Sequence, residues 1–231
     1  MRIVLLSDIH GNVVALEAVL AAIRRDAAPD ALFVAGDLVL NGPRPAETLA
    51  LLRTIDQAQF VRGNTDQYLI DRAADSDAVD FARAQLPQAA IDFVDALPFA
   101  QSLEAAPGHA LLVVHANPRD LEGQITPTSP VAQLRPWFAG VTADVIAFGH
   151  YHVPFTRQLD RRTLFDVASV GMPRDGDQRA VYATLDWDGT GWHAAHHRVA
   201  FDIAAVARDY ATVGFPHAQH AAEWLLRARY G

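Results

Sequence analysis

The stretch MRIVLLSDIHGN, residues 1–12, decides how the chain begins to fold. Its apolar run Ile3–Leu6 is rich in branched side chains and ends in a polar turn, which predicts a buried β-strand. Asp8 and His10 follow this strand at once, and Asn12 can cap a helix that starts directly after it. The stretch therefore predicts a strand, a polar loop and a helix in direct succession.

The same order of elements recurs further along the chain. Helical spacing of apolar residues predicts helices at Asn12–Arg25 and at Arg44–Gln57, the second with Pro45 near its start. Short apolar runs predict five buried strands, at Ile3–Leu6, Ala31–Ala35, Gln59–Arg62, Ala110–Val114 and Val145–Phe148. Strands that alternate with helices are the pattern of an α/β fold.

Two further regions have a different pattern of apolar and polar residues. Residues 65–100 are polar, with a helical pattern that Pro87 and Pro98 interrupt, and we expect a helical insertion or edge beside the functional site. After His152, turns containing Asp and Gly separate four predicted strands, at Thr156–Leu159, Leu164–Val170, Ala180–Trp187 and Gly191–Phe201. We expect these strands to form an antiparallel second sheet. Closing helices are predicted at Asp202–Thr212 and Pro216–Tyr230.

Length and composition bound the class of protein. A chain of 231 residues can form one sizeable core, so we expect a single domain over residues 1–231, with a helical segment at 65–100. The net charge of −8 argues against polymeric nucleic acid as a partner, because such binding needs a broad basic surface. The chain has no cysteine and no lysine, which excludes thiolate catalysis, cysteine zinc sites, Schiff bases and the lysine-dependent phosphate loop.

Nothing in the sequence predicts export or membrane insertion. Asp8 interrupts the apolar run at the N-terminus, which is too short for a signal peptide. No stretch approaches the roughly 18 apolar residues of a membrane span. We therefore expect a cytoplasmic protein with no membrane partner, and the sequence leaves its oligomeric state open.

A residue type that binds metals follows each of the five strands predicted first. These residues are Asp8 and His10, Asp37, Asn64, His115, and His150 with His152, in the order of the strands. Because ligands gather beyond the carboxyl ends of the strands in α/β sheets, the seven side chains should converge. Carboxylate, amide and imidazole donors together suit Mn, Fe, Zn, Ni or Co, and an Asp can bridge two ions. This pattern predicts two divalent metal ions and in-line hydrolysis by a metal-bound hydroxide.

The motifs that carry these residues resemble the ordered motif set of the calcineurin-like metallophosphoesterase superfamily. They are Asp8-Ile9-His10-Gly11, Gly36-Asp37, Gly63-Asn64, His115-Ala116 and Gly149-His150-Tyr151-His152. Residues 5–12 and 169–174 are further similar to the small bacterial branch of that superfamily. The resemblance implies a four-layer α/β/β/α sandwich of two mixed sheets flanked by helices. It also implies a phosphoesterase acting on a small phosphorylated substrate.

The resemblance implies a role for each ligand residue as well. Asp8, His10 and His152 would hold one metal ion, Asn64, His115 and His150 the other, and Asp37 would bridge both. Mn is the preferred metal, with Fe, Zn, Ni and Co as alternatives. We assign catalytic roles to Asp37, Asn64 and His115. Substrate binding is assigned to Asn64 and Arg174, because a guanidinium offers a bidentate fork to phosphate.

Thr65 departs from the pattern of the superfamily. Many members have His directly after the Gly-Asn pair, followed by an acid, and that His is thought to protonate the leaving oxygen; here Thr65 and Asp66 follow Asn64. A general acid contributes typically about 10²–10⁴ in rate. We therefore hypothesise that aryl or nucleotide-type phosphodiesters, or pyrophosphate linkages, are hydrolysed better than alkyl monoesters.

Structural roles compete with some of these assignments. Asp8 alone would more often cap the following helix, and Asn64 could belong to ordinary Gly-Asn turn chemistry. Further candidates for contacts around the site are Asn41, Asn117 and Arg119. The histidines of the predicted strand at 191–201 are expected to lie away from the site, and they are His193, His196 and His197.

Two other functions are open on the sequence alone. A few members of the superfamily have become interaction modules, so the chain could be a catalytically weak metal-binding or protein-interaction module of the same fold. Such modules typically lose metal ligands, whereas all seven positions here carry competent residues. A dinuclear site could also hydrolyse a nonphosphate ester or amide, in which case inorganic phosphate would not inhibit it.

Overall fold

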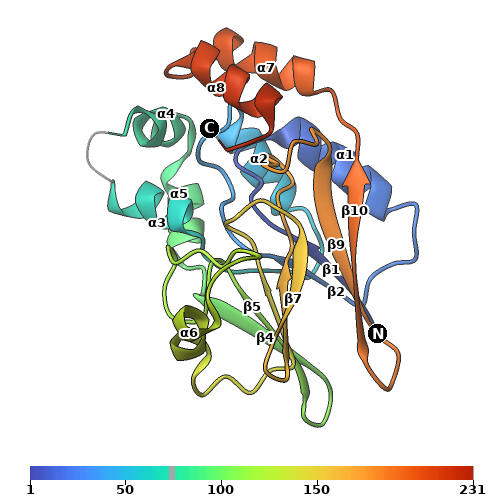
Figure 1. Cartoon of the computed structure of the whole chain (residues 1–231). Helices are drawn as coiled ribbons and strands as arrows, with labels where there is room; N and C mark the ends of the chain where they lie inside the picture. Colours follow the sequence, from blue (N-terminus) through green and yellow to red (C-terminus); the bar gives the residue numbers. More distant parts are fainter. Residues whose placement is uncertain (73–75, 231) are drawn as a thin grey trace.

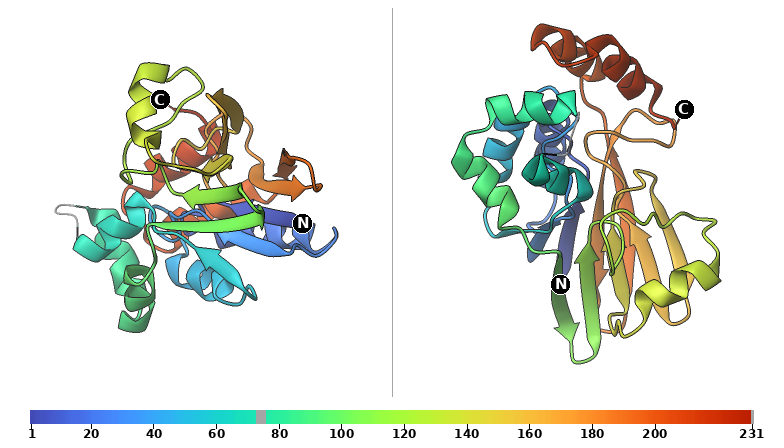
Figure 2. Two further views of the ribbon diagram at one scale, coloured as in Figure 1. Left: turned by 90° about the horizontal axis from the view of Figure 1, so that it is seen from below. Right: turned by 90° about the vertical axis from the view of Figure 1, so that its left-hand side faces the viewer.

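The computed structural model describes residues 1–72 and 76–230. Among these residues, two five-stranded sheets pack face to face with helices on their outer faces (Figure 1 and Figure 2). The order of the first sheet is β10-β9-β1-β2-β3, and that of the second is β4-β5-β6-β8-β7. Both sheets combine parallel and antiparallel pairs. The predicted four-layer α/β/β/α sandwich is confirmed.

The strands are short and lie close to the predicted runs. In the first sheet they are β1 (Arg2–Leu6), β2 (Ala31–Val34), β3 (Ala58–Phe60), β9 (Ala180–Trp187) and β10 (Trp192–Val199). In the second sheet they are β4 (Ala100–Ala106), β5 (His109–Val114), β6 (Val145–Phe148), β7 (Phe155–Leu159) and β8 (Arg162–Asp166).

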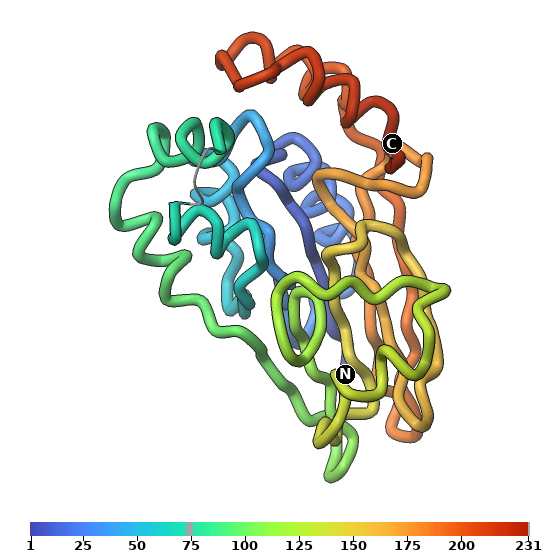
Figure 3. The backbone as a smooth tube through the Cα atoms, turned by 60° about the vertical axis from the view of Figure 1, so that its left-hand side comes forward, coloured from blue at the N-terminus to red at the C-terminus, as the bar shows by residue number. Residues whose placement is uncertain are grey.

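The helices form the two outer layers and one end of the molecule. They are α1 (Val13–Ile23), α2 (Pro45–Leu52), α3 (Asn64–Asp71), α4 (Asp77–Gln85), α5 (Gln88–Asp95), α6 (Val131–Leu134), the 3-10 helix η1 (Arg135–Phe138), α7 (Ile203–Thr212) and α8 (Ala218–Arg227). Helices α1 to α5 share a core with the first sheet, and α6 with η1 packs on the second. Helices α7 and α8 lie across one end of the sandwich (Figure 3).

Strand β1 shows why its sequence is apolar without alternation. Ile3 and Leu5 pack between the two sheets, whereas Val4 and Leu6 pack against the helices on the outer face. Successive side chains of a strand point to opposite faces, so a strand covered on both faces needs apolar residues at every position. The Asn12 side chain then accepts a hydrogen bond from Ala15 N at 3.0 Å and caps α1, as the sequence predicts.

The prediction of an antiparallel second sheet after His152 is wrong. Strands β7 and β8 complete the sheet that contains β5 and β6, and β8 pairs with β6 in parallel. Strands β9 and β10 form an antiparallel hairpin that joins the first sheet at β1. The strand predicted at Leu164–Val170 also ends early, because the chain leaves the ladder after Asp166. Strand patterns indicate which faces are buried, but not which partner each strand selects.

The segment 65–100 is helical, as predicted, and ends in a strand that the sequence analysis did not predict. Helices α3, α4 and α5 occupy it, while residues 73–75 lie outside the described residues. Strand β4 begins at Ala100 and pairs antiparallel with β5. Its exposed edge position allows a mixed sequence such as AQSLEAA, which lacks a clear strand pattern.

In the described part of the chain, no helix has both the length and the apolar character needed to cross a bilayer.

Candidate metal centre

The seven predicted ligand residues lie together at the end of the sandwich that α7 and α8 cover. Six of them occupy the loops that follow β1, β2, β5 and β6, and Asn64 is the first residue of α3, shortly after β3. Because β1 to β3 belong to one sheet and β5 and β6 to the other, the site spans both sheets. The structure thus brings together side chains that are up to 144 residues apart in the chain, since Asp8 and His152 approach within 3.0 Å.

A first cluster consists of Asp8, His10, Asp37 and His152. One donor atom from each of these residues lies within 4.8 Å of every other. His10 Nε2 is 3.3 Å from His152 Nε2, and His152 Nε2 is 3.0 Å from Asp8 Oδ1. Metal–donor bonds of about 2.0–2.2 Å place neighbouring donors about 3–3.5 Å apart, so these four residues can hold one divalent ion.

A second cluster consists of Asn64, His115 and His150, next to the first. His115 Nε2 is 2.9 Å from Asn64 Oδ1 and 3.2 Å from His150 Nδ1. Asp37 lies between the clusters: its Oδ1 is 3.4 Å from His115 Nε2 and its Oδ2 is 3.6 Å from His10 Nε2. The two oxygens of one carboxylate therefore face different groups of donors.

Each of the four histidines hydrogen-bonds a backbone carbonyl through one ring nitrogen. The bonds join His10 Nδ1 to Leu40 O (3.0 Å), His115 Nδ1 to Ala35 O (2.8 Å), His150 Nε2 to Glu122 O (3.0 Å) and His152 Nδ1 to Met172 O (2.7 Å). A carbonyl only accepts, so this nitrogen carries the hydrogen and the other nitrogen of a neutral ring has a lone pair. All four lone pairs are directed into the clusters, as expected of metal-ligating histidines.

These lone pairs test whether metal ions fit the site. Two of them face each other across 3.3 Å in the first cluster and across 3.2 Å in the second. Asp8 Oδ1 is buried and has no hydrogen-bond partner among the described residues. Buried electron-pair donors without a proton between them are satisfied by a cation, because an unpaired buried polar atom is costly. The donor chemistry of the site therefore fits divalent metal.

Burial controls the protonation of the site. It lowers the pKa of His10 to about 3 and that of His150 to about 4, so both rings are neutral near pH 7. Burial raises the pKa of Asp37 to about 7, and the neighbouring Asp8 carboxylate adds to this increase. For Asp8 itself burial acts in the same direction, but His152, His115 and His10 together outweigh it and hold the pKa well below its usual value.

Five of the seven residues have a left-handed backbone. Their φ angles are +53° at Asp8, +49° at His10, +57° at Asp37, +66° at His150 and +59° at His152. Non-glycine residues rarely adopt this conformation, and each instance costs about 1–3 kcal/mol of strain. Such strain persists where the surrounding structure determines the conformation, as at a binding site. The loops are therefore shaped to direct these side chains inward.

Two glycines allow the loops to approach each other. A Cβ atom on Gly63 would overlap the Asp37 carboxylate and backbone. A Cβ atom on Gly149 would overlap the Ser7 and Asp8 side chains. The Gly-Asn and Gly-His pairs of the sequence motifs thus have a packing reason, because the glycine brings the following ligand close to its partners.

Asp66 positions the bridging region, a role that the sequence analysis did not assign. Its buried carboxylate accepts hydrogen bonds from Asp37 N at 2.9 Å, Leu38 N at 3.0 Å and Gly63 N at 2.9 Å. It therefore connects the loop after β2 to the start of α3, which carries Asn64. The acid at the third position of a helix is a known capping signal, and this signal was present in the sequence.

Tyr68 and Glu122 also contact ligand residues and were not predicted. Tyr68 lies one turn after Asn64 on α3, and its phenol oxygen accepts a hydrogen bond from Asn64 Nδ2 at 3.3 Å. That bond directs Asn64 Oδ1 toward the second cluster. The phenol donates to Glu122 Oε1 at 2.5 Å, and Glu122 O accepts from His150. The spacing of Tyr68 from Asn64 was a usable signal, whereas nothing in the sequence indicated Glu122.

The other predicted contact residues differ in burial and in the groups that they contact. Arg174 is only 6% exposed, and its backbone N–H donates to His152 O at 3.2 Å. Asn41 follows Leu40, the partner of His10. Asn117 is buried and holds its own loop through Asp120 and Gly123, whereas Arg119 is exposed and bonds to Ala139 O.

The three histidines of β10 take no part in either cluster. His193 is exposed and pairs with Asp188 at 2.8 Å in the β9–β10 turn. His196 donates to Asp166 O, and His197 bonds to Thr184 and stacks on Tyr182.

A sandwich of two mixed sheets with clustered Asp, Asn and His at the ends of their strands defines a metal-dependent phosphoesterase architecture. The sequence model of the calcineurin-like phosphoesterase superfamily domain matches residues 1–190 of this chain. The chain belongs to this superfamily.

Curated relatives match in two ways. An uncharacterized protein of Methanocaldococcus jannaschii is 28% identical over 209 residues, which cover 80% of this chain and 82% of that protein. A symmetrical bis(5'-nucleosyl)-tetraphosphatase of Sodalis glossinidius is 42% identical, but only over 71 residues. That match covers 30% of this chain and 25% of the tetraphosphatase, so the likeness to the tetraphosphatase is local.

Solved structures extend the likeness over the whole chain. A metallophosphoesterase from Sphaerobacter thermophilus has a TM-score of 0.83 at 28% identity, covering 99% of this chain and 100% of its own. A hypothetical protein from Pyrococcus horikoshii has a TM-score of 0.85 at 16% identity, with coverage of 100% and 99%. At such low identity the second comparison shows a shared fold alone.

Proposed function

We propose that this protein is a dinuclear metal-dependent phosphoesterase that hydrolyses phosphodiester or phosphoanhydride bonds of small substrates, including aryl and nucleotide phosphates. The observation that carries the proposal is the pair of adjacent donor clusters that share the Asp37 carboxylate. Its oxygens lie 3.6 Å and 3.4 Å from one imidazole of each cluster. Metal pairs about 3.5–4 Å apart are typical of phosphatases and nucleases.

The proposed ligands follow the two clusters. Asp8, His10 and His152 would hold one ion, Asn64, His115 and His150 would hold the other, and Asp37 would contribute to both. When bound, two divalent ions lower the pKa of a water nucleophile and offset charge on the phosphoryl oxygens. Mn is the proposed occupant, with Fe, Zn, Ni and Co as alternatives, because mixed nitrogen and oxygen donors suit all of these ions. The carbonyl-bound histidines keep this geometry without reorganisation during the reaction.

Asn64 and Arg174 are the proposed substrate-binding residues. The Asn64 amide is part of the second cluster, while Tyr68 fixes its orientation. The Arg174 guanidinium donates to Trp224 O and to Met172 Sδ, and among the described residues it has no ion-pair partner, although Arg174 is 6% exposed. A nearly buried cation without an anionic partner suits a phosphate oxygen.

The leaving group is the basis for the proposed substrate preference. Thr65 occupies the position where many members of the superfamily have His, so no imidazole is available there to protonate the leaving oxygen. Thr65 is buried, and its hydroxyl has no hydrogen-bond partner among the described residues. Leaving groups of low pKa need no such proton. The local match to tetraphosphatases, which act on nucleoside phosphoanhydrides as their names state, supports the same class of substrate.

A panel of substrates tests the proposal. Purified protein loaded in turn with Mn²⁺, Co²⁺, Ni²⁺ and Zn²⁺ is assayed on aryl phosphodiesters, a dinucleoside polyphosphate and alkyl monoesters graded by leaving-group pKa. We expect hydrolysis that chelation abolishes and a rate that falls as the leaving-group pKa rises. Turnover without metal would refute the proposed mechanism, and a flat dependence would refute the substrate preference. Stoichiometric metal without turnover on any substrate would favour a metal-binding module instead.

A further inference from the structure

A cavity of about 480 Å³ lies beside the proposed metal centre, between α8 and the loops of the sandwich. Its lining residues are Asn41, Ser76, Asp77, Ala78, Met172, Arg174, Phe215, Pro216, His217, His220, Ala221 and Trp224. This size falls within the range of about 300–1,000 Å³ for small-molecule sites. We call it the α8 cavity.

Three lining residues connect the α8 cavity to the first ligand cluster. Met172 lines it with its side chain while its carbonyl accepts from His152 Nδ1 at 2.7 Å. Arg174 donates its backbone N–H to His152 O, and Asn41 directly follows Leu40, whose carbonyl binds His10. These contacts place the α8 cavity next to the loops that carry His10 and His152.

One wall of the α8 cavity consists of stacked planar groups. The Arg174 guanidinium lies over the Trp224 indole, 4.8 Å from the ring centroid, and its Nη1 donates to Trp224 O at 3.2 Å. The imidazole of His220 lies 5.9 Å from the same indole. Trp224 is 36% exposed, so its ring is accessible. Arg and Trp faces are the surfaces on which nucleobases stack.

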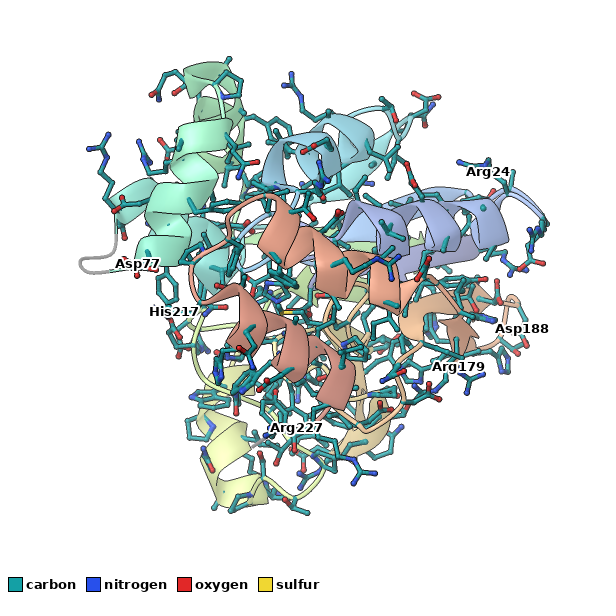
Figure 4. The ribbon with its side chains drawn as sticks, turned by 90° about the horizontal axis from the view of Figure 1, so that it is seen from above. Arg24, Asp77, Arg179, Asp188, His217 and Arg227 are labelled. Carbon is teal, nitrogen blue, oxygen red and sulfur yellow. The ribbon has the colours of Figure 1, made fainter. Side chains whose placement is uncertain are left out.

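Part of the lining of the α8 cavity is polar. Asp77, at the start of α4, and His217, just before α8, lie next to each other with 3.5 Å between Oδ2 and Nε2 (Figure 4). Ser76 and Asn41 add a hydroxyl and an amide to the lining. Flat apolar walls combined with several hydrogen-bonding groups suit a planar ring with a polar edge, such as a nucleobase, better than a plain hydrocarbon.

Half of this lining lies outside the part of the chain that the superfamily model matches. That match ends at residue 190, whereas Phe215, Pro216, His217, His220, Ala221 and Trp224 all come after it. The segment after residue 190 therefore supplies half of this cavity. Because function depends on local sites added to a fold, such a segment can determine which substrate is bound.

From these observations we infer that the α8 cavity is the specificity subsite for the nucleobase of a nucleotide-type substrate. The base stacks on the wall formed by Arg174 and Trp224, and its polar edge meets the polar part of the lining at Ser76, Asp77 and His217. Arg174 faces a phosphate oxygen of the same molecule. The inference rests on the proposed phosphoesterase function, because it assumes that a phosphate occupies the metal centre.

Binding of AMP and of ribose 5-phosphate to the Mn²⁺-loaded protein, measured by isothermal titration calorimetry, tests the subsite. The two probes differ only in the base. We expect AMP to bind more tightly, and Trp224→Ala to weaken AMP binding about 5- to 150-fold while ribose 5-phosphate binding stays unchanged. Trp224→Phe, which keeps an aromatic face, should retain most of the affinity. Benzyl phosphate, an alkyl monoester with a plain ring, should bind more weakly than AMP, because this ring lacks a polar edge.

Leu226→Ala is the matched control, because Leu226 is 41% exposed on the same helix and does not line the cavity. This variant should bind AMP like the unmodified protein. Equal affinity for AMP and ribose 5-phosphate, or equal weakening of both by Trp224→Ala, would overturn the subsite. Equal affinity for benzyl phosphate and AMP would overturn its assignment to a nucleobase. Base-dependent binding without hydrolysis of any substrate would refute the proposed function and leave the subsite standing.

Discussion

At the scale of single residues, the site depends on side chains whose buried electron-pair donor atoms need a cation as partner. In the neutral form, each of the four histidines carries its hydrogen on the nitrogen that faces a carbonyl, so the remaining nitrogen has only a lone pair to offer. Asp8 Oδ1 is likewise buried without a donor among the described residues. Substitutions of these residues should therefore affect metal content before they affect the fold.

Asp37→Ala is expected to abolish activity and reduce metal content, because one carboxylate faces both clusters. Metal analysis by mass spectrometry together with steady-state rates checks this. His193→Ala is the control and should keep activity near normal, since His193 contacts Asp188 at the far turn. Full metal content in Asp37→Ala would show that the ligand assignment is wrong. A large loss in His193→Ala would show that β10 reaches the site.

Asp66→Asn should lower both stability and metal affinity. The Asp66 carboxylate accepts three backbone N–H bonds, and an amide would direct N–H groups at one or more of these donors. Leaving buried donors unsatisfied costs about 1–3 kcal/mol each in the free energy of unfolding. Urea denaturation measures this loss. Asp92→Asn, at an exposed position of α5, is the control and should change stability by no more than about 0.5 kcal/mol.

At the scale of elements, the junctions between strands and loops place the candidate ligands. Strands β1, β2 and β3 direct their following loops to the same end as β5 and β6, although the two groups belong to different sheets. The short helix α3 begins at Asn64, so its first turn lies within the site. Close packing of these loops requires glycine where a side chain would overlap a ligand.

Gly63→Ala should reduce metal affinity by at least about tenfold, because the added Cβ overlaps the Asp37 carboxylate and shifts it. Mutations of residues that hold metal ligands in place typically change metal affinity by about 10–100-fold. Competition with a fluorescent chelator gives the affinity. Gly191→Ala is the matched control, since a Cβ there has no neighbour within 4 Å. Unchanged affinity in Gly63→Ala would mean that the loop relaxes without moving Asp37.

At the scale of the whole molecule, the proposed metal centre joins the two sheets. Asp8, His10 and Asp37 come from loops of the first sheet, and His115 and His150 from loops of the second. The two sheets also pack against each other through an apolar core that contains residues such as Leu5 and Val113. Ions that bind only when both sets of loops are in place must stabilise the folded state.

Saturating Mn²⁺ should therefore raise the thermal unfolding temperature of the protein, and chelation should lower it. At a free concentration about 100 times the dissociation constant, binding contributes about 2.7 kcal/mol to the free energy of unfolding. Differential scanning calorimetry measures the shift, and Asp37→Ala should show little of it. An unfolding temperature that is independent of metal would contradict a site assembled from both sheets.

The local patterns of the sequence determined the strand–loop units and the types of their terminal residues. A strand buried on both faces must be apolar at each position, as in Ile3–Leu6, and a ligand loop must carry Asp, Asn or His. Both requirements act over a few neighbouring residues, so they can be read in order along the chain. The fold class and the seven candidate ligands could be predicted for this reason.

Tertiary structure alone decided how these units combine. The sheet membership of β7 to β10, the pairing of β4 with β5 and the buried contacts of Asp66 depend on partners distant in sequence. The wall of Arg174 and Trp224 likewise joins residues 50 positions apart. Such pairings are selected by the free energy of packing the whole chain, and a local pattern of apolar and polar residues is compatible with several of them.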